Sequence, residues 1–222
     1  MTDITFSIAD YPEIRNRIIL LHTKIYNKLS PEDIKTCGCN LDVWIGNGLA
    51  IDSEQELNLF ADYAIYAYRP KGFNMAENFL RFFHNEAEEY ELALLRYMQS
   101  AHYSIYQVEE TNGVDTVNVA DIYSKVQYKI IDFKLAKTTF QGEIIASYLI
   151  DFEDSSIQTG ASVIMAPEIL ASNAMKQLID YMKDEYPGDF LSYPEISTLL
   201  AKNMVALALK LGQRSKVGRM KL

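Results

Sequence analysis

The positions of the apolar residues divide the chain into three stretches. In the first hundred residues, and again after residue 166, apolar residues recur every three or four positions. The first such run follows Pro12 and consists of Ile14, Ile18, Leu21, Ile25 and Leu29. This spacing places apolar side chains on one face of a helix, so we expect amphipathic helices in both stretches.

Most of the expected helices are preceded by a polar residue with a carboxylate three positions later. This pattern occurs at Asp10–Glu13, Ser30–Asp33, Ser53–Glu56, Asn74–Glu77 and Ser192–Glu195. The polar side chain can accept a hydrogen bond from a first-turn amide that has no partner inside the helix. The pattern therefore predicts five helix starts, and further helices are expected over residues 86–100 and after Pro167.

Between the helical stretches the apolar period shortens to two. Over residues 103–110, Tyr103 and Ile105 share one face of a strand, and Tyr106 and Val108 share the other. Further strands are expected at 117–122, 128–133, 143–152 and 156–165, with turns at Asn112-Gly113 and Gly142. Short strands separated by turns are typical of an antiparallel meander or a small open barrel. The predicted fold class is therefore α+β, with a helical N-terminal region, a central antiparallel β module and a helical C-terminal region.

No repeat, low-complexity run or flexible linker separates these parts. We therefore expect one compact unit with two lobes. Its predicted parts are a helical lobe at 1–101, a β module at 102–166, C-terminal helices at 167–213 that pack on the rest, and a basic tail at 214–222 for which disorder is one alternative.

The charge of the chain bears on its partners. The net charge is −9 and the pI about 4.9, so the average field repels a phosphate backbone and disfavours nucleic acid as a partner. The end of the chain is the exception, with the cations Lys210, Arg214, Lys216, Arg219 and Lys221. A solvated tail explains them, and a small contact surface for RNA, a membrane or an acidic protein is the alternative.

The sequence also predicts where the protein works. No stretch reaches the roughly 20 apolar residues of a transmembrane helix, and the first residues lack the basic and apolar regions of a secretory signal. The two cysteines, Cys37 and Cys39, are spaced poorly for a disulfide. We therefore expect a soluble protein of the cytoplasm with no membrane contact.

Metal ligands are the first chemistry to consider. Cys37 and Cys39 form a single pair, whereas a structural zinc site usually needs two pairs. His84, Glu88 and Glu91 would share one face of a continuous helix, but Asn85 is expected to break the helix there. Three histidines without a nucleophile motif indicate no catalytic triad. The sequence thus predicts no metal and no cofactor.

A polar stripe after Ser53 is the candidate binding site. Asp62, Tyr66 and Arg69 are spaced at i, i+4 and i+7, and Tyr66 could bridge the acid and the arginine. Glu77 could join them from the next helix. A buried acid, arginine and tyrosine network would be a functional cleft, and an exposed ion pair is the alternative.

Several segments resemble a group of uncharacterised bacterial proteins. The segments are 62–72, the Asn-x-x-Glu start at Asn74, 103–110, 142–146 and Thr159-Gly160. Some members of that group end in a cysteine-rich SEC-C zinc motif, which this chain lacks. The resemblance, over about half the chain, implies a bacterial cytosolic origin and assigns no catalytic residue.

Three functions remain open at this stage. The first is a non-enzymatic binding or scaffold protein, whose partner is another protein or a second copy bound through the apolar C-terminal helix at 196–211. The second is a metal-dependent hydrolase with a cleft between the helical lobe and the β module, using Asp62, Arg69, His84 and Glu88. The third is an RNA-associated factor that uses the basic tail and aromatic strands.

Overall fold

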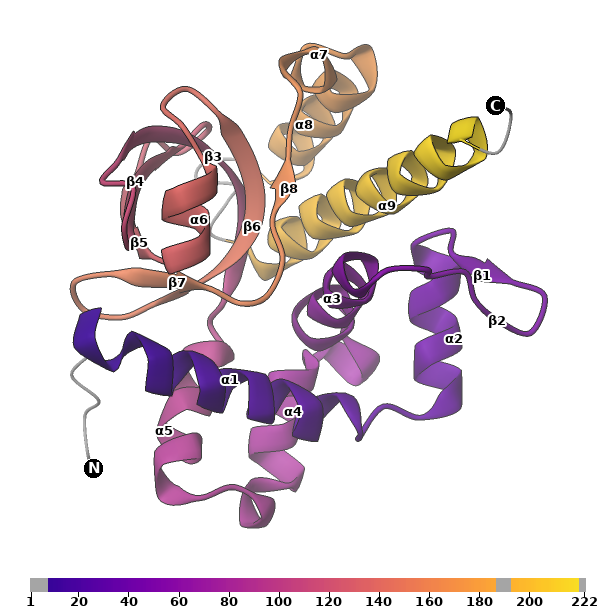
Figure 1. Cartoon of the computed structure of the whole chain (residues 1–222). Coiled ribbons are helices and arrows are strands. Elements are labelled where there is room, and N and C mark those ends of the chain that lie inside the picture. Colours follow the sequence, from indigo (N-terminus) through magenta and orange to yellow (C-terminus); the bar gives the residue numbers. More distant parts are fainter. Residues whose placement is uncertain (1–7, 187–192, 220–222) are drawn as a thin grey trace.

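The computed structural model describes residues 8–186 and 193–219, with the side chains of residues 9–186 and 193–210. Helix α1 (Tyr11–Tyr26) runs along one side of the molecule, passing the β-barrel at its start and α3 at its end (Figure 1). The other helices of the N-terminal lobe are α2 (Pro31–Asn40), α3 (Glu54–Asp62), α4 (Met75–Phe82) and α5 (Glu89–Met98). A short hairpin of β1 (Trp44–Ile45) and β2 (Gly48–Leu49) lies against α2. The helices of the N-terminal lobe thus precede the barrel strands in the sequence and form a layer on one side of the barrel (Figure 1).

The predicted capping signals have different outcomes. Ser30 and Asn74 form the expected reciprocal capping boxes with the carboxylates three residues later, and Ser53 accepts from the amide of Glu56. Asp10 directly precedes α1, but its side chain caps no amide because its own backbone is already helical. The Ser192–Glu195 signal begins outside the described residues. Most helix starts therefore follow from local hydrogen bonding alone.

The central strands close into a barrel. They are β3 (His102–Thr111), β4 (Thr116–Asp121), β5 (Gln127–Ile131), β6 (Ile144–Asp151) and β7 (Ser156–Gln158). Their order is β3-β4-β5-β7-β6, and β6 pairs back onto β3. A two-residue strand, β8 (Val163–Ile164), extends the sheet on β6. Helix α6 (Phe133–Thr138) connects the third barrel strand to the fourth. This connectivity is that of the OB-fold barrel.

The prediction of a purely antiparallel module was wrong. β5 and β7 pair in parallel through Ile130 and Ser156, so the barrel is mixed. The chain leaves β5 through α6, crosses to β6 beside β3, and returns in β7 to fill the gap next to β5. Alternation within one strand reports its buried face and carries no information about its distant neighbour. The strand expected at 156–165 is also two strands in the structure, β7 and β8, with a loop between them.

Two apolar cores among the described residues support this arrangement. The barrel interior is filled by residues such as Tyr106, Val119 and Leu149. A larger core joins α1, α3 and the outer face of the barrel to the C-terminal helices α8 (Asn173–Glu185) and α9 (Pro194–Arg219), which follow the short α7 (Pro167–Leu170). Apolar residues on the outer face of the barrel are therefore buried against the helices.

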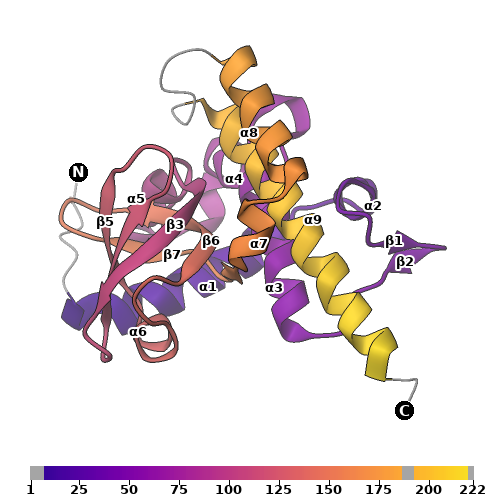
Figure 2. The ribbon, with the colours of Figure 1, turned by 90° about the horizontal axis from the view of Figure 1, so that it is seen from above.

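Helix α9 passes over α3 and beyond it (Figure 2). Its apolar face, including Ile196, Leu200 and Met204, is buried against α3, β3, β8 and the segment after α3. The apolar stripe of this helix thus has a partner within the chain. The backbone remains helical through Arg219, whereas the side chains of the predicted basic tail lie outside the described part. Along the described residues, no helix is both long and apolar enough to cross a membrane.

Tyrosine hydroxyls offer a test of this core. The Tyr11 hydroxyl donates to Asp132 Oδ2 at 3.0 Å and so ties α1 to the start of α6. The Tyr148 hydroxyl is buried and has no hydrogen-bond partner in the described part of the chain. We predict that Tyr11→Phe lowers the free energy of unfolding by about 1–2 kcal/mol, because a bond to a charged acceptor is lost. Tyr148→Phe should change it by less than about 0.5 kcal/mol. Urea unfolding of both variants checks this, and a larger loss for Tyr148→Phe would contradict it.

Candidate functional site

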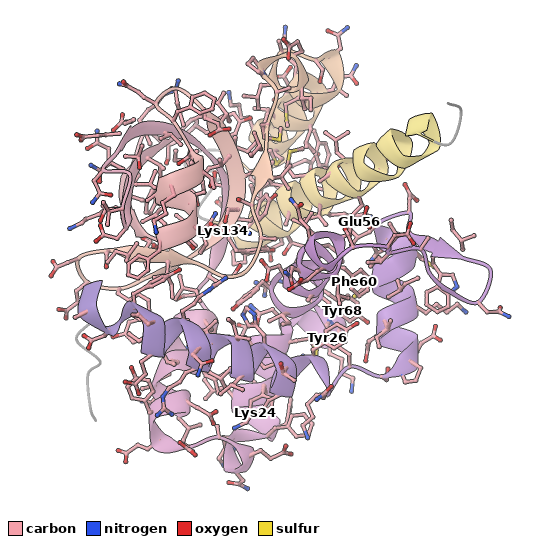
Figure 3. The ribbon with its side chains drawn as sticks, in the orientation of Figure 1. Lys24, Tyr26, Glu56, Phe60, Tyr68 and Lys134 are labelled. Atoms are coloured by element: carbon pink, nitrogen blue, oxygen red, sulfur yellow. The ribbon has the colours of Figure 1, made fainter. Side chains whose placement is uncertain are left out.

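A groove lies between α1, α3 and the barrel. It consists of two adjoining cavities of about 340 and 720 Å³, which share Arg15, Glu54, Asn58 and Gly160. The smaller cavity lies between α1 and α3 and is called the α1–α3 pocket below. The larger one extends to the start of α6. Tyr26 of α1 lines the pocket and Lys134 of α6 lines the larger cavity, and both are labelled in Figure 3. The volumes are in the range of ligand sites in proteins.

A π-helical turn begins directly after Asp62, the last residue of α3 and a lining residue of the pocket. Residues Tyr63–Ala67 form this turn, which closes with the amide of Tyr68 donating to the carbonyl of Tyr63 at 2.9 Å. All five of its residues are buried. A π-turn holds one residue more than an α-turn and therefore shifts the side chains that follow it. Such turns frequently occur at functional sites.

Asp62 lies at the floor of the pocket, just before the π-turn. It is 4% exposed, and its Oδ2 accepts from Thr159 Oγ1 at 2.7 Å and from the amide of Ala161 at 3.1 Å. Its Oδ1 accepts no hydrogen bond from any described residue. Burial raises the pKa of this carboxyl to about 6, and the hydrogen bonds and Arg15 oppose that rise only in part. The site therefore contains a buried carboxylate with an unused oxygen.

Gly160 permits this arrangement by its lack of a side chain. A Cβ at this position would lie 2.6 Å from Asp62 Oδ1 and 2.9 Å from Oδ2. The carboxylate thus rests directly against the backbone between β7 and β8. Glycine is needed here for close approach.

Arg15 holds the same loop from the other side. One terminal nitrogen donates to the carbonyls of Gln158 and Thr159, each at 2.6 Å, and the other donates to Gly160 at 3.4 Å. The Arg15 guanidinium and the Asp62 carboxylate, both in the described part of the chain, do not approach within the 4 Å of an ion pair. The arginine is therefore occupied by backbone carbonyls and lowers the pKa of Asp62 only from a distance.

His22 lines the pocket and contacts the buried Tyr66 behind it. His22 Nε2 and the Tyr66 hydroxyl lie 2.7 Å apart, within hydrogen-bond distance. Burial, with a smaller effect from Arg15, lowers the pKa of His22 to about 3, so the imidazole is neutral at physiological pH. Burial and then Asp62 hold the pKa of Tyr66 well above its usual value. The pair of His22 and Tyr66 therefore adds no charge to the pocket.

The structure divides the predicted polar stripe and the Glu77 that was expected to join it. Asp62 lines the pocket, whereas Tyr66 contacts His22 behind the pocket wall and does not bridge to Arg69. Arg69 donates to Glu77 Oε2 at 3.2 Å and to Thr198 of α9 at 3.3 Å. The stripe assumed one continuous α-helix, whereas α3 ends at Asp62 and the π-turn changes the register beyond it.

The spacing argument missed Arg15, His22, Thr159 and Gly160. Arg15 and His22 lie next to apolar residues in α1, and a single arginine or histidine on a helix does not by itself indicate a binding site. Thr159-Gly160 stood out only as part of the family resemblance. These residues meet because the β7–β8 loop folds onto α1 and α3, which is a contact across more than 90 positions of the chain.

The other candidate ligands do not meet. In the described part of the chain, no three side chains of His, Cys, Asp or Glu gather around a point where they could hold a metal ion. Glu91 pairs with Lys24 at 2.7 Å, Glu88 pairs with Arg17 at 3.4 Å, and His84 belongs to a separate 3-10 turn. Cys37 is buried, which raises the pKa of its thiol to about 12, and Cys39 is exposed.

Asp62 predicts an unusual pH dependence of stability. Between its ordinary pKa near 4 and its folded pKa of about 6, the folded state binds the proton more tightly than the unfolded state. Stability therefore falls as pH rises through this window, by about 3 kcal/mol at about 1.4 kcal/mol per pKa unit. In Asp62→Asn this loss should be absent. Urea unfolding of both proteins from about pH 4 to pH 7 measures the difference. Parallel pH profiles would contradict the prediction.

Gly160→Ala should displace the carboxylate and lower the free energy of unfolding by about 1–3 kcal/mol, because the new methyl group overlaps Asp62. Gly48→Ala is the matched control, since a Cβ there meets nothing within 4 Å, and we expect a change within about 0.5 kcal/mol. In an Asp62→Ala background the cost of Gly160→Ala should shrink. An undiminished cost would show that the clash is not with Asp62.

Comparison with known proteins gives a family and nothing further. Residues 6–187 match DUF7986, which is described as a family of unknown function. No curated protein and no solved structure matches the chain. Because the match spans most of the sequence, the chain belongs to this family of unknown function, DUF7986.

Proposed function

We propose that this protein is a non-enzymatic binding protein that takes an extended segment of a partner protein along the groove between α1, α3 and the barrel. One observation carries the proposal. Two cavities join into a continuous groove, and large apolar side chains stand half exposed along it. Ile19 and Leu57 line the pocket, and Ile164 lines the larger cavity at 62% exposure. Exposed apolar groups beside a groove are typical of surfaces that bind a partner.

The edge strand β8 supports an extended occupant. It is the terminal strand of the sheet and pairs only with β6 among the described strands. Its Ile164, together with Ala161 and Ser162 of the loop before it, lines the larger cavity. A partner segment running along this wall would meet backbone groups as well as apolar side chains, as in recognition by strand addition.

Catalysis has less support from the same groove. Among the described residues, two hydroxyls contact carboxylates there. Thr159, on Asp62, is 0% exposed, and Tyr11, on Asp132, is 7% exposed with a pKa that burial raises above its usual value, so neither is available as a nucleophile. His22 contacts a tyrosine whose pKa is raised, and not a nucleophile. The four residues suggested for a hydrolase also have separate surroundings: Asp62 lies in the pocket, Arg69 beside Glu77, Glu88 beside Arg17, and His84 in a turn.

Binding of RNA by the barrel has an electrostatic obstacle. OB-fold barrels bind nucleic acid on the face of their second and third strands and at the loops beside it. Here that region has a hollow of about 690 Å³ that includes Glu109 and Glu110, with a single Lys129. The neighbouring loops add the acids Asp115, Glu153 and Asp154 against one cation, Lys125. A face for single strands combines positive charge with stacking aromatics, and this face is acidic.

We further propose that the protein acts in the cytoplasm, where both cysteines stay reduced. Bacterial origin and relatives with a SEC-C motif stay predictions of the sequence resemblance. Self-association through α9 is not part of the proposal, because the described apolar face of that helix packs inside the chain. Association of two copies through the groove is an outcome that the next experiment would detect.

A library of random peptides displayed on phage, selected on the full-length protein, tests the groove. We expect enriched peptides whose binding is lost in Ile19→Asp, since a charge there disrupts the apolar wall. Leu20→Asp is the matched control, because Leu20 is exposed like its neighbour, at 51% against 48%, but does not line the pocket. Failure to enrich any peptide, or equal loss in both variants, contradicts the proposal. Enrichment of a peptide identical to a segment of this chain would indicate self-association.

A further inference from the structure

The α1–α3 pocket has the form of a socket for one side chain. Its cavity of about 340 Å³ has apolar walls contributed by Ile19, Tyr26, Leu57 and Ala61. These residues surround the approach to Asp62, which is the buried acid at the floor. A long side chain with an apolar stem and a polar end would bury its stem along such walls.

Among the described residues, Asp62 at the floor of the pocket forms no ion pair with a cation. Asp62 Oδ2 is occupied by Thr159 and Ala161, while Oδ1 has no hydrogen bond from a described residue. A carboxylate removed from water is stabilised chiefly by a paired charge or by further hydrogen bonds. Arg15 cannot complete it, because its donors are directed to three backbone carbonyls.

A second acidic residue, Glu54, also lines the pocket. Glu54 belongs to both cavities of the groove, is exposed, and has no ion pair among the described residues. His22 adds no opposing charge, since its imidazole is neutral. The charges that face the pocket from α1, α3 and the β7–β8 loop are therefore Arg15, Asp62 and Glu54, with Arg15 turned to the loop.

We propose that the α1–α3 pocket receives a lysine or arginine side chain of the partner segment, with the charged end on Asp62 Oδ1 and Glu54 guiding its entry. This inference rests on the proposed function, because the basic side chain is taken to belong to the segment in the groove. It adds the chemistry that the partner must carry. A segment with one basic residue flanked by apolar residues would match the acidic pocket and the apolar walls beyond it.

Two small probes test the pocket without a known partner. Nα-acetyl-lysine methylamide and Nα-acetyl-arginine methylamide carry the basic side chains, and Nα-acetyl-norleucine methylamide is the neutral counterpart. Each is titrated into the ¹⁵N-labelled full-length protein. We expect saturable shifts of the Gly160 and Ala161 amides with at least one basic probe and none with norleucine, and the stronger basic probe identifies the preferred residue. No saturable shift with either basic probe, or equal shifts with norleucine, overturns the inference.

Variants then locate the charge. Asp62→Asn keeps the shape and the acceptor for Thr159 and Ala161 but removes the charge, and it should weaken the basic probe by about tenfold or more. Glu54→Gln, an exposed change that leaves folding intact, should weaken it by about two- to fivefold. Glu109→Gln is the control on the distant acidic face and should change nothing. Unchanged binding in both Asp62→Asn and Glu54→Gln overturns the inference.

The selected peptides distinguish the proposed function of the groove from the inference about the pocket. If groove-binding peptides keep their affinity when each lysine and arginine is replaced by norleucine, the pocket inference fails and the proposed function stands. If the basic probes bind at Asp62 but no peptide binds the groove, the proposed function fails and the pocket takes a free cation instead.

Discussion

The β7–β8 loop is held between two side chains of opposite charge, and the groove depends on that clamp. Arg15 of α1 donates to the carbonyls of residues 158–160, and Asp62 at the end of α3 accepts from the side chain of Thr159 and the amide of Ala161. Both contacts use charge-assisted hydrogen bonds, which are stronger than neutral ones. They attach two helices of the N-terminal lobe to one loop of the barrel. The cavities of the groove are the space left between the elements joined in this way.

The clamp has a cost that a purely structural contact would avoid. Asp62 is charged at neutral pH although burial raises its pKa, and one of its oxygens accepts no hydrogen bond from the part of the chain that the structure describes. A π-turn follows it directly, where a regular α-helix would be the more stable geometry. Perturbed carboxyl groups and irregular turns tend to gather where a protein binds something. The neighbouring Arg69 donates to Glu77 and to Thr198, and so ties the segment after α3 to α9.

The barrel illustrates how fold and function separate. Its strand order is that of folds that often bind nucleic acid, yet the corresponding face here is acidic and the groove lies elsewhere, against α1 and α3. The helices of this chain cover part of the barrel with an apolar core, so that surface is unavailable to a ligand. A shared topology says which strands are neighbours, whereas the side chains on each face decide what can bind.

The sequence by itself determined the local structure. The spacing of Ile14, Ile18 and Leu21 specifies the buried face of α1, and Ser30 and Asn74 start their helices through hydrogen bonds that span three residues. Alternation located β3, β4, β5 and β6 to within two residues, since a strand's faces are a local property, but it joined β7 and β8 into one strand. Tertiary structure alone decided the parallel β5–β7 pair, the π-turn that separates Tyr66 from Arg69, and the meeting of Arg15, Asp62 and Gly160. These features depend on which distant segments pack together, and that choice is made by the whole core, not by any stretch of the chain.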